Sequence, residues 1–543
     1  MALMSEDTPP NPNVSELTER PSGFRMAVNP PVFFTSAVLI LAFALAAVLA
    51  PKRAERIFTH VQEFLVQNFG WFYILAVAGF LVFVIFLMLS RHGNIKLGPD
   101  DSEPEYSYLS WFAMLFAAGT GVGLLFWSIA EPMTHFGGNP FSEQAGTPAA
   151  AIKSLSLSFF HWGLNGWAIF SVVGLSMAYF SFRRKLPLTI RSALYPLIGD
   201  RIHGPIGHAV DIFAVVATVF GIATTLGLGA SQMNTGLDWL FGIGVTPTTQ
   251  LVIIAIVTVI ATGSVVTGVH KGVRRLSEFN LGLSMLLLLV FLVAGPTTVL
   301  CAMLVQATGD YLDTLLAMSF WTGVSSDYQW QFDWTVFYWG WWISWAPFVG
   351  MFIARVSKGR TLREFVFGVL LVPSLITFVW IALLGGTALY MELTGTGTIQ
   401  EAVREDVAVA LYQTIGTLPM PSEAIALTGG VATLLIAVYF ITSADSGTLV
   451  ITTIMAHGDP EPPRIQRVLW GLGSGALTAA LLVAGGIQVL QDAVITAGLP
   501  FSVVMLVMVV GMVRALKDER FAPVPGRKHR LAKEVWTGRD EVS

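Results

Sequence analysis

"YILAVAGFLVFVIFLML", residues 73–89, is a run of apolar side chains without a single charge. A helix needs about 20 such residues to cross the hydrocarbon core of a bilayer, and the neighbouring residues extend this run to that length. Comparable runs occupy residues 33–50 and 281–300, where the sequence reads "FFTSAVLILAFALAAVLA" and "LGLSMLLLLVFLVAGPTTVL". These stretches predict an all-α integral membrane protein that crosses the bilayer many times.

The composition of the whole chain agrees with this prediction. Of 543 residues, 54% are hydrophobic and only 12% are charged, whereas soluble domains carry about 25% charged residues. The net charge of −4 is too close to neutral to suggest a nucleic-acid partner. Cys301 is the single cysteine, so an internal disulfide is excluded, and no Cys/His pattern typical of a metal site is evident. No span groups the titratable side chains that an enzyme needs, so we expect neither catalysis nor a cofactor.

We predict about twelve spans, and the basic residues of the loops orient them. Lys and Arg concentrate in every second loop, for example at residues 183–201 and 355–363, while the alternate loops hold few of them. Cytoplasmic loops carry this excess, so an even number of spans places both termini in the cytoplasm. The span centres fall near residues 41, 80, 121, 167, 222, 260, 290, 343, 377, 439, 475 and 503.

Several segments lie outside the predicted spans. Residues 1–30 are polar and Pro-rich, and we expect a disordered cytoplasmic tail there. Residues 516–543 form a short basic tail, which either senses anionic membrane lipid or simply anchors the last span. The longest external loops are expected at residues 306–333 and 392–421. Within the second, "TIQEAVREDVAVALYQTIG" (398–416) has the pattern of an amphipathic helix on the outer surface.

Two spans depart from plain lipid-facing helices. In the third, "FAAGTGVGLLFW" (116–127) places Gly119, Gly121 and Gly123 at alternate positions. Glycine costs about 1 kcal/mol against alanine inside a helix. The spacing of two favours local unwinding, although close helix packing, with its usual spacing of four, is the simpler alternative. In the tenth, "YFITSADSGTLV" (439–450) interrupts an apolar run with hydroxyls and Asp445. Paired interrupted spans are typical of a transporter's binding site.

The eighth span is dominated by tryptophan. "WTVFYWGWWISWAPFVG" (334–350) holds five tryptophans in twelve positions. An aromatic belt at the membrane surface explains Trp321, Trp330 and Trp334 but not the deeper rings. Those deeper rings recur at i, i+3, i+4 and i+7 and therefore share one helical face; they are Tyr338, Trp341, Trp342 and Trp345.

A second aromatic group lies in the fourth span, within "HWGLNGWAIF" (161–170), and comprises Trp162, Trp167 and Phe170. Aromatic faces attract cations, and several together select quaternary ammonium groups, which cannot donate hydrogen bonds. Each desolvated contact is worth about 2 kcal/mol. The two groups together therefore predict a cage for a methylated cation.

The extended segment "WTVFYWGWWISWAPFVGMFIARVSKGRTLREF" (334–365) closely resembles the signature span and following loop of the betaine/carnitine/choline transporter (BCCT) family. The resemblance covers residues 30 to 515 and includes the glycine stretch, "HWGLNGW", "ATVFGIATTLGLG" and "TSADSG". It implies a leucine-transporter-like core of two inverted five-helix repeats, at residues 109–305 and 334–515. Two additional helices in residues 31–108 would precede that core. The resemblance also implies a homotrimer in a bacterial inner membrane.

Matching positions imply where the substrate binds. The aromatic box would be Trp162, Trp167, Phe170 and Trp342, with Trp341 and Trp345 completing the pocket and the glycine backbone receiving a carboxylate. The family usually has tyrosine where this chain has Phe170. Its choline carriers have an acidic residue at the position of Gly123. The sequence therefore favours a zwitterion such as glycine betaine, with dimethylsulfoniopropionate next and choline or carnitine as the alternative.

The resemblance also implies sodium as the coupling ion. One site would use carbonyls of Ala117, Thr120 and Tyr439 with the hydroxyls of Thr442 and Ser443. Without the resemblance, those two hydroxyls would simply be expected to bond to their own helix. A second site would use Thr218 and Phe348, but it is in doubt because Ile222 replaces the hydroxyl expected one turn further on.

Three alternatives remain open. Glu131 and His161 lie at the outer ends of spans, where helix packing or solvated loops would account for them, yet they could carry protons in place of sodium. An amino-acid symporter of the same fold would want hydrogen-bond acceptors for its substrate's ammonium group more than ring faces. An ion channel would need a repeated filter motif, and aromatic stripes would obstruct ion flow.

Overall fold

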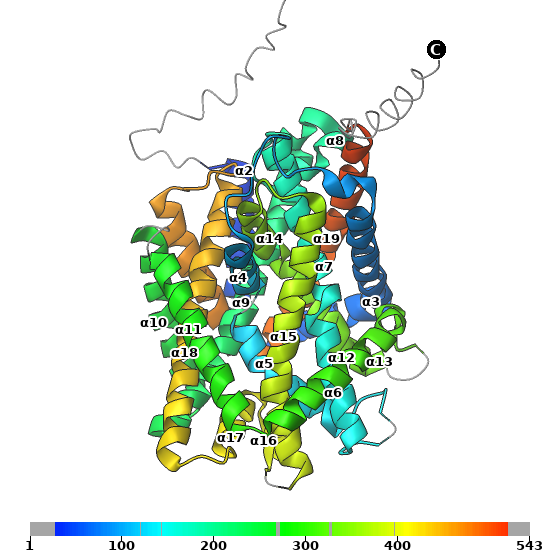
Figure 1. The fold of residues 1–543 in the computed structure, drawn as a ribbon. Coiled ribbons are helices and arrows are strands. Elements are labelled where there is room, and N and C mark those ends of the chain that lie inside the picture. Colours follow the sequence, from blue (N-terminus) through cyan, green and yellow to red (C-terminus); the bar gives the residue numbers. More distant parts are fainter. Residues whose placement is uncertain are drawn as a thin grey trace, which may run out of the picture.

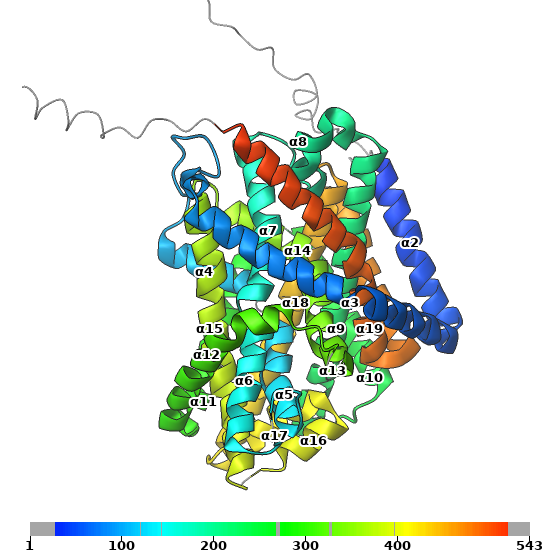
Figure 2. The same cartoon turned by 90° about the vertical axis from the view of Figure 1, so that its right-hand side faces the viewer.

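The computed structural model describes residues 28–519, apart from residues 120, 143, 268–271, 325–327 and 396, and apart from the side chains of residues 118, 267 and 272–277. Nearly all of the described chain is helical, and its only strand-like pairing is an antiparallel bridge between Lys96 and Thr361. The helices form an upright bundle, which the long helix α3 crosses obliquely (Figures 1 and 2). The all-α prediction is confirmed. Of the two predicted tails, at residues 1–30 and 516–543, residues 1–27 and 520–543 lie outside the described residues, while α2 already begins at Pro30 and α19 continues to Lys517.

The first half of the chain supplies most of the helices around the site. They are α2 (Pro30–Leu49), α3 (Pro51–Leu89), η1 (Arg91–Asn94), α4 (Tyr108–Gly119), α5 (Val122–Gly137), α6 (Pro148–Trp162), α7 (Leu164–Ala178), η2 (Tyr179–Arg183), η3 (Ile190–Leu194), α8 (Tyr195–Ile198), η4 (Gly199–His203), α9 (Pro205–Phe241), α10 (Pro247–Thr267) and α11 (Gly272–Ala294).

The second half contains the tryptophan-rich helix and the longest helix. Its elements are α12 (Thr297–Phe320), α13 (Tyr328–Gln331), η5 (Phe332–Val336), α14 (Phe337–Val356), α15 (Leu362–Leu393), α16 (Ile399–Glu405), η6 (Val407–Val409), α17 (Ala410–Gly416), α18 (Ser422–Met455) and α19 (Arg464–Lys517).

Within the described residues, nine helices are long and apolar enough to cross a membrane, or ten when α4 and α5 count as one bent span. The predicted twelve differ for identifiable reasons. Helix α19 runs for 54 residues and holds two predicted spans, with non-helical backbone at Gly485 and Gly486 between them. Helix α14 is too rich in tryptophan to qualify by hydropathy, although it is almost wholly buried. The count of twelve stays a prediction.

The external loops differ from expectation. Helix α12 occupies residues 297–320, so most of the loop predicted at 306–333 is helical. It packs beside α6, to which an ion pair between Lys153 and Asp310 attaches it. The single amphipathic helix predicted at 398–416 is instead three short pieces: α16, η6 and α17. Asp406 causes the first break because its backbone is extended and its carboxylate accepts the Ala408 N–H in place of a helical carbonyl.

The tenth span is not interrupted, so that prediction is wrong. Helix α18 is continuous from Ser422 to Met455. Its hydroxyl groups donate to carbonyls of their own helix, as Thr448 does to Ala444 and Thr452 does to Thr448. This back-bonding satisfies polar side chains at membrane depth without unwinding the helix. Polar residues interrupt the apolar run in the sequence, but they do not interrupt the helix.

Both ends of the described chain lie on one side of the bundle, the upper side in Figures 1 and 2, while α16 and α17 lie at the opposite end. On that upper side, Arg183 pairs with Asp100 and, through a second nitrogen, with Glu519 just after α19. Burial alone would raise the pKa of the Glu519 carboxyl, but hydrogen bonds from Arg183 and Tyr179 hold that pKa below its ordinary value. The end of α19 is thereby attached to the end of α7.

Candidate functional site

The glycine stretch interrupts the third span, as predicted. Helix α4 ends at Gly119, and extended backbone at Gly121 begins α5, so that the two helices bend by 69°. The glycines lie against indole rings. A Cβ added to Gly119 would lie 2.1 Å from Cη2 of Trp167, and one added to Gly123 would lie 2.6 Å from Cη2 of Trp341. Close packing and interruption therefore occur together, and only glycine permits both.

Four of the predicted aromatic side chains line one cavity beside this break. Trp162 and Trp342 meet edge to face, with ring centroids 4.8 Å apart. Phe170 lies 5.4 Å from Trp167 and 5.9 Å from Trp342, also edge to face. Each of the four is at most 5% exposed. The complete lining is Gly119, Trp162, Gly166, Trp167, Phe170, Trp342 and Thr377.

Two lining residues, Gly166 and Thr377, were missed from the sequence. Gly166 lies within the quoted motif "HWGLNGW", and a Cβ there would lie 3.1 Å from Nε1 of Trp342. This close approach of Gly166 to Trp342 cannot be inferred from the spacing of residues in the sequence, so the sequence offered no reason to choose Gly166. Thr377 comes from α15, whose uniform apolar sequence gives no hint of a site.

Trp341 and Trp345 lie behind the cavity rather than in its wall. Trp341 stacks on Trp342, with centroids 4.8 Å apart and planes inclined by 15°. Trp345 lies against the break, since its Cη2 lies 3.7 Å from a Cβ added to Gly121. The two rings support the cavity-lining residues and the glycine backbone.

Of the residues of α18 that are predicted to bind sodium, Ser443 lies beside the same break. Ser443 Oγ lies 3.3 Å from a Cβ added to Gly121. Thr442 donates its hydroxyl proton to the carbonyls of Val438 and Tyr439, at 3.0 and 3.1 Å. Its oxygen accepts a hydrogen bond from Asn280, at 3.2 Å. The alternative of back-bonding is therefore realised for Thr442, while Ser443 faces the break.

The other members of that site are less informative. Ala117 lies in the last turn of α4, where it is exposed, and Thr120 lies outside the described residues. The carbonyl of Tyr439 belongs to the continuous helix α18. The hydroxyl of the Tyr439 side chain is hydrogen-bonded to Ser284 at 2.8 Å.

The residues of the doubtful second sodium site make contacts within the helix bundle. Thr218 donates to the Ala214 carbonyl of its own helix at 2.7 Å. Phe348 packs edge to face on Trp345, 5.4 Å between centroids. Ile222, which stands where the second hydroxyl was expected, lies against Gly447. Where the family pattern has a hydroxyl, this chain therefore has an apolar side chain that packs against α18.

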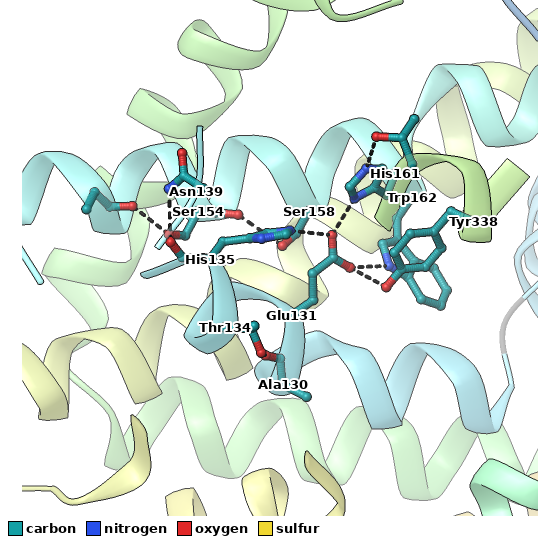
Figure 3. Close-up of polar contacts among 12 residues, drawn as sticks. Ala130, Glu131, Thr134, His135, Asn139, Ser154, Ser158, His161, Trp162 and Tyr338 are labelled. Carbon is teal, nitrogen blue, oxygen red and sulfur yellow. Dashed lines mark hydrogen bonds and ion pairs between the residues drawn. The ribbon is translucent and has the colours of Figure 1, made fainter. Parts of the chain in front are cut away.

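Glu131 and His161 are not in solvated loops, and that interpretation is wrong. Both side chains are fully buried. A hydrogen bond of 2.6 Å joins His161 Nδ1 to Glu131 Oε1 (Figure 3). Trp162 Nε1 donates to the other carboxylate oxygen at 3.0 Å, and the Tyr338 hydroxyl donates to the same atom. The pair is therefore in direct contact with a ring of the cavity.

His135 completes a cluster that the sequence did not predict. It lies one turn after Glu131 on α5, and its Nε2 is 3.4 Å from Glu131 Oε1. Ligand atoms of Glu131, His135 and His161 all fall within 4.8 Å of one another, a grouping able to hold a metal. Tetrahedral zinc separates its ligands by about 3.3 Å. The 2.6 Å contact between Glu131 and His161 is shorter, so we interpret the pair as hydrogen-bonded rather than prepared for metal.

Comparison with known proteins decides the family. The family profile described as "BCCT, betaine/carnitine/choline family transporter" matches residues 31–521. The chain belongs to this family.

Named relatives of this BCCT transporter divide between two substrates. A "Probable glycine betaine transporter" of Desulfitobacterium hafniense is 45% identical over 491 residues, which cover 90% of this chain and 97% of the relative. The "Glycine betaine transporter OpuD" of Bacillus subtilis is 42% identical, covering 90% and 94%. The "High-affinity choline transport protein" of Escherichia coli is also 42% identical, covering 91% and 73%. The chain is a multi-pass membrane transporter and not an enzyme.

Proposed function

We propose that this BCCT transporter imports a zwitterionic quaternary ammonium compound, glycine betaine before dimethylsulfoniopropionate, by sodium symport with alternating access. The cavity formed by Trp162, Trp167, Phe170 and Trp342 carries the proposal. Its four aromatic rings meet one another edge to face. A methylated ammonium group donates no hydrogen bond, so ring faces can replace its water at about 2 kcal/mol for each desolvated contact.

A carboxylate on the substrate is supported by the glycine stretch. The first N–H groups of α5, which begins at Val122, lack helical acceptors, and the positive end of the helix dipole favours an anion there. An acidic side chain at position 123 would compete for this place. Its Cβ would already be 2.6 Å from Cη2 of Trp341 and 3.5 Å from Cη2 of Trp162. Gly123 therefore supports a zwitterion over choline. Sequence identity does not distinguish these substrates, because a glycine betaine transporter and a choline transport protein are equally similar to this chain.

Sodium coupling is supported by the position of Ser443 beside the break and by the oxygen of its neighbour Thr442. A hydroxyl that donates its proton to its own helix keeps lone pairs for a cation, and oxygen is the ligand that sodium prefers. Displacing the Asn280 amide from Thr442 would free one of those lone pairs. We expect one sodium site here, shared with carbonyls of the glycine stretch.

We also propose a bacterial inner-membrane location and a homotrimer, as expected for the family. Arg183 pairs with Glu519 at one end of the described chain, and Arg191 contacts His208, which is also bonded to Asn29 at the other end. Excess basic residues are typical of the cytoplasmic side. The end formed by α16 and α17 would then face outward.

Reconstituted protein tests the proposal. Proteoliposomes with an inward sodium gradient should accumulate labelled glycine betaine, and potassium in place of sodium should abolish uptake. Excess unlabelled primary amino acid is the control. If it competes as well as betaine does, the substrate class is wrong. Uptake that follows a proton gradient without sodium would instead assign coupling to the buried pair of Glu131 and His161.

A further inference from the structure

Two rings of the cavity are held through their indole nitrogens. Trp162 Nε1 donates to the carboxylate of Glu131 at 3.0 Å, and Trp342 Nε1 donates to the backbone carbonyl of His161 at 2.9 Å. The supporting rings differ, since Nε1 of Trp341 and of Trp345 is buried without a hydrogen-bond partner in the described part of the chain. Anchoring therefore distinguishes Trp162 and Trp342, in the wall, from Trp341 and Trp345 behind it.

The helix break explains why the His161 carbonyl is free to accept. Helix α6 ends at Trp162, and Gly163 separates it from α7. The last four carbonyls of a helix have no helical donor. Trp342, on α14, supplies a donor to one of them. The interruption that places Trp162 in the cavity thus also provides the acceptor that orients Trp342.

Glu131 links three helices around these rings (Figure 3). Its carboxylate accepts from His161, Trp162 and Tyr338, which belong to α6 and α14, while Glu131 itself lies on α5. The Tyr338 ring also stacks on the His161 ring, with centroids 4.7 Å apart. A buried carboxylate is tolerated only with such charge-assisted partners. In return, it fixes the orientation of each donor.

The carboxylate also acts on the electronic properties of Trp162. Glu131 is not among the residues that line the cavity, and it is joined to the cavity wall through Trp162. It accepts the N–H at the edge of the indole. An anion at that edge polarises the ring toward greater electron density, and the attraction of a ring for a cation grows with that density.

On the basis of the proposed function, we propose that Glu131 and His161 are positioning residues for the aromatic cavity. Glu131 fixes and polarises Trp162, and the His161 backbone fixes Trp342. The negative charge that favours a cationic substrate thus reaches it through an indole ring rather than by contact. Because the charge of Glu131 acts through the indole ring, it does not directly repel the carboxylate of a zwitterion.

A double-mutant cycle with purified full-length protein tests this inference. The dissociation constant for glycine betaine is measured by calorimetry for wild type, Glu131→Gln, Trp162→Phe and the double variant. Losing a hydrogen bond to a charged group should raise the dissociation constant about tenfold in the wild-type background. In the Trp162→Phe background, Glu131→Gln should raise the dissociation constant by less than about threefold, because the indole N–H that donates to Glu131 is already absent.

The matched control is Asp445→Asn, since Asp445 is an equally buried carboxylate that accepts from Ser264 and does not line the cavity. Its effect should be the same in both backgrounds. If Glu131→Gln does not fold, Tyr338→Phe removes another donor to the same carboxylate and takes its place in the cycle. Equal effects of either variant in both backgrounds would overturn the inference.

A second measurement needs no substrate. Indole ¹⁵N–¹H resonances of the ligand-free protein report hydrogen bonding at each tryptophan, and Trp→Phe variants assign them. Glu131→Gln should move the Trp162 resonance and leave that of Trp345 in place. An unmoved Trp162 resonance would refute positioning by Glu131. If wild-type protein binds no betaine, the proposed function fails, and this spectrum still decides the role of Glu131.

Discussion

Replacing Gly119 by alanine should disable substrate binding without disturbing the helices around it. The added Cβ would lie 2.1, 2.6 and 3.0 Å from Cη2, Cζ2 and Cζ3 of Trp167. Carbon atoms pack at about 3.5–4.0 Å, so the ring must retreat by about 1.5 Å. Overpacking of this kind costs about 1–3 kcal/mol of folding free energy.

The expected loss of binding follows from the same displacement. A Trp167 ring moved by about 1.5 Å leaves its place in the cavity wall, and one desolvated cation–ring contact of about 2 kcal/mol disappears. That loss corresponds to a dissociation constant raised about thirtyfold. Calorimetry with glycine betaine measures it, and thermal unfolding measures the packing cost.

Gly79→Ala is the matched control. Gly79 is also inside a transmembrane helix, but a Cβ there would meet no atom within 4 Å. Alanine is the better helix former by about 1 kcal/mol, so this variant should bind betaine normally and be no less stable. In a rescue, Gly119→Ala combined with Trp167→Phe should recover stability, because the smaller ring removes the clash. Wild-type affinity in Gly119→Ala alone would refute the reasoning.

Four further outcomes are expected. Trp342→Ala should abolish betaine uptake while expression stays normal, because this ring contacts two other wall residues; normal uptake in vesicles would limit it to packing. Gly123→Asp should weaken betaine uptake, because its Cβ would lie 2.6 Å from Cη2 of Trp341 and its carboxylate would compete with that of the substrate, as uptake assays with labelled betaine would report. Thr442→Ala combined with Ser443→Ala should raise the sodium concentration needed for half-maximal uptake, and high sodium should restore betaine affinity because the two bindings are linked. Glu519→Gln should destabilise the protein at neutral pH: the pKa of this carboxyl is lower in the folded state, so its contribution is present above the ordinary value of 4.5 and is lost as pH falls through the lowered pKa. Unfolding curves that differ equally at acidic and neutral pH would contradict this.

Local sequence was sufficient wherever a pattern depends on a single helix. Apolar runs predicted membrane helices because the length of a span is fixed by bilayer thickness and helical rise. The period of the tryptophans placed Trp341, Trp342 and Trp345 on one face, and the alternate glycines predicted the break between α4 and α5. Each conclusion rests on contacts between residues a few positions apart.

Local sequence misled where a competing interaction was equally local. Hydroxyls in α18 resembled an interruption, yet they bond to their own helix and leave it continuous. Residues 306–320 resembled a loop because they are less apolar than their neighbours, although nothing in them prevents a helix. Composition describes solubility in the membrane, whereas helix formation depends on whether backbone groups can pair.

The tertiary structure alone decided which side chains meet. Trp342 lines the cavity while Trp341, its neighbour in sequence, lies behind it, because α14 can turn only one ring of the face toward α6 and α7. Glu131 and His161 are 30 positions apart, and no periodicity relates them. What brings them together is the packing of α5 against α6, where a buried carboxylate must find donors on whichever helix lies beside it.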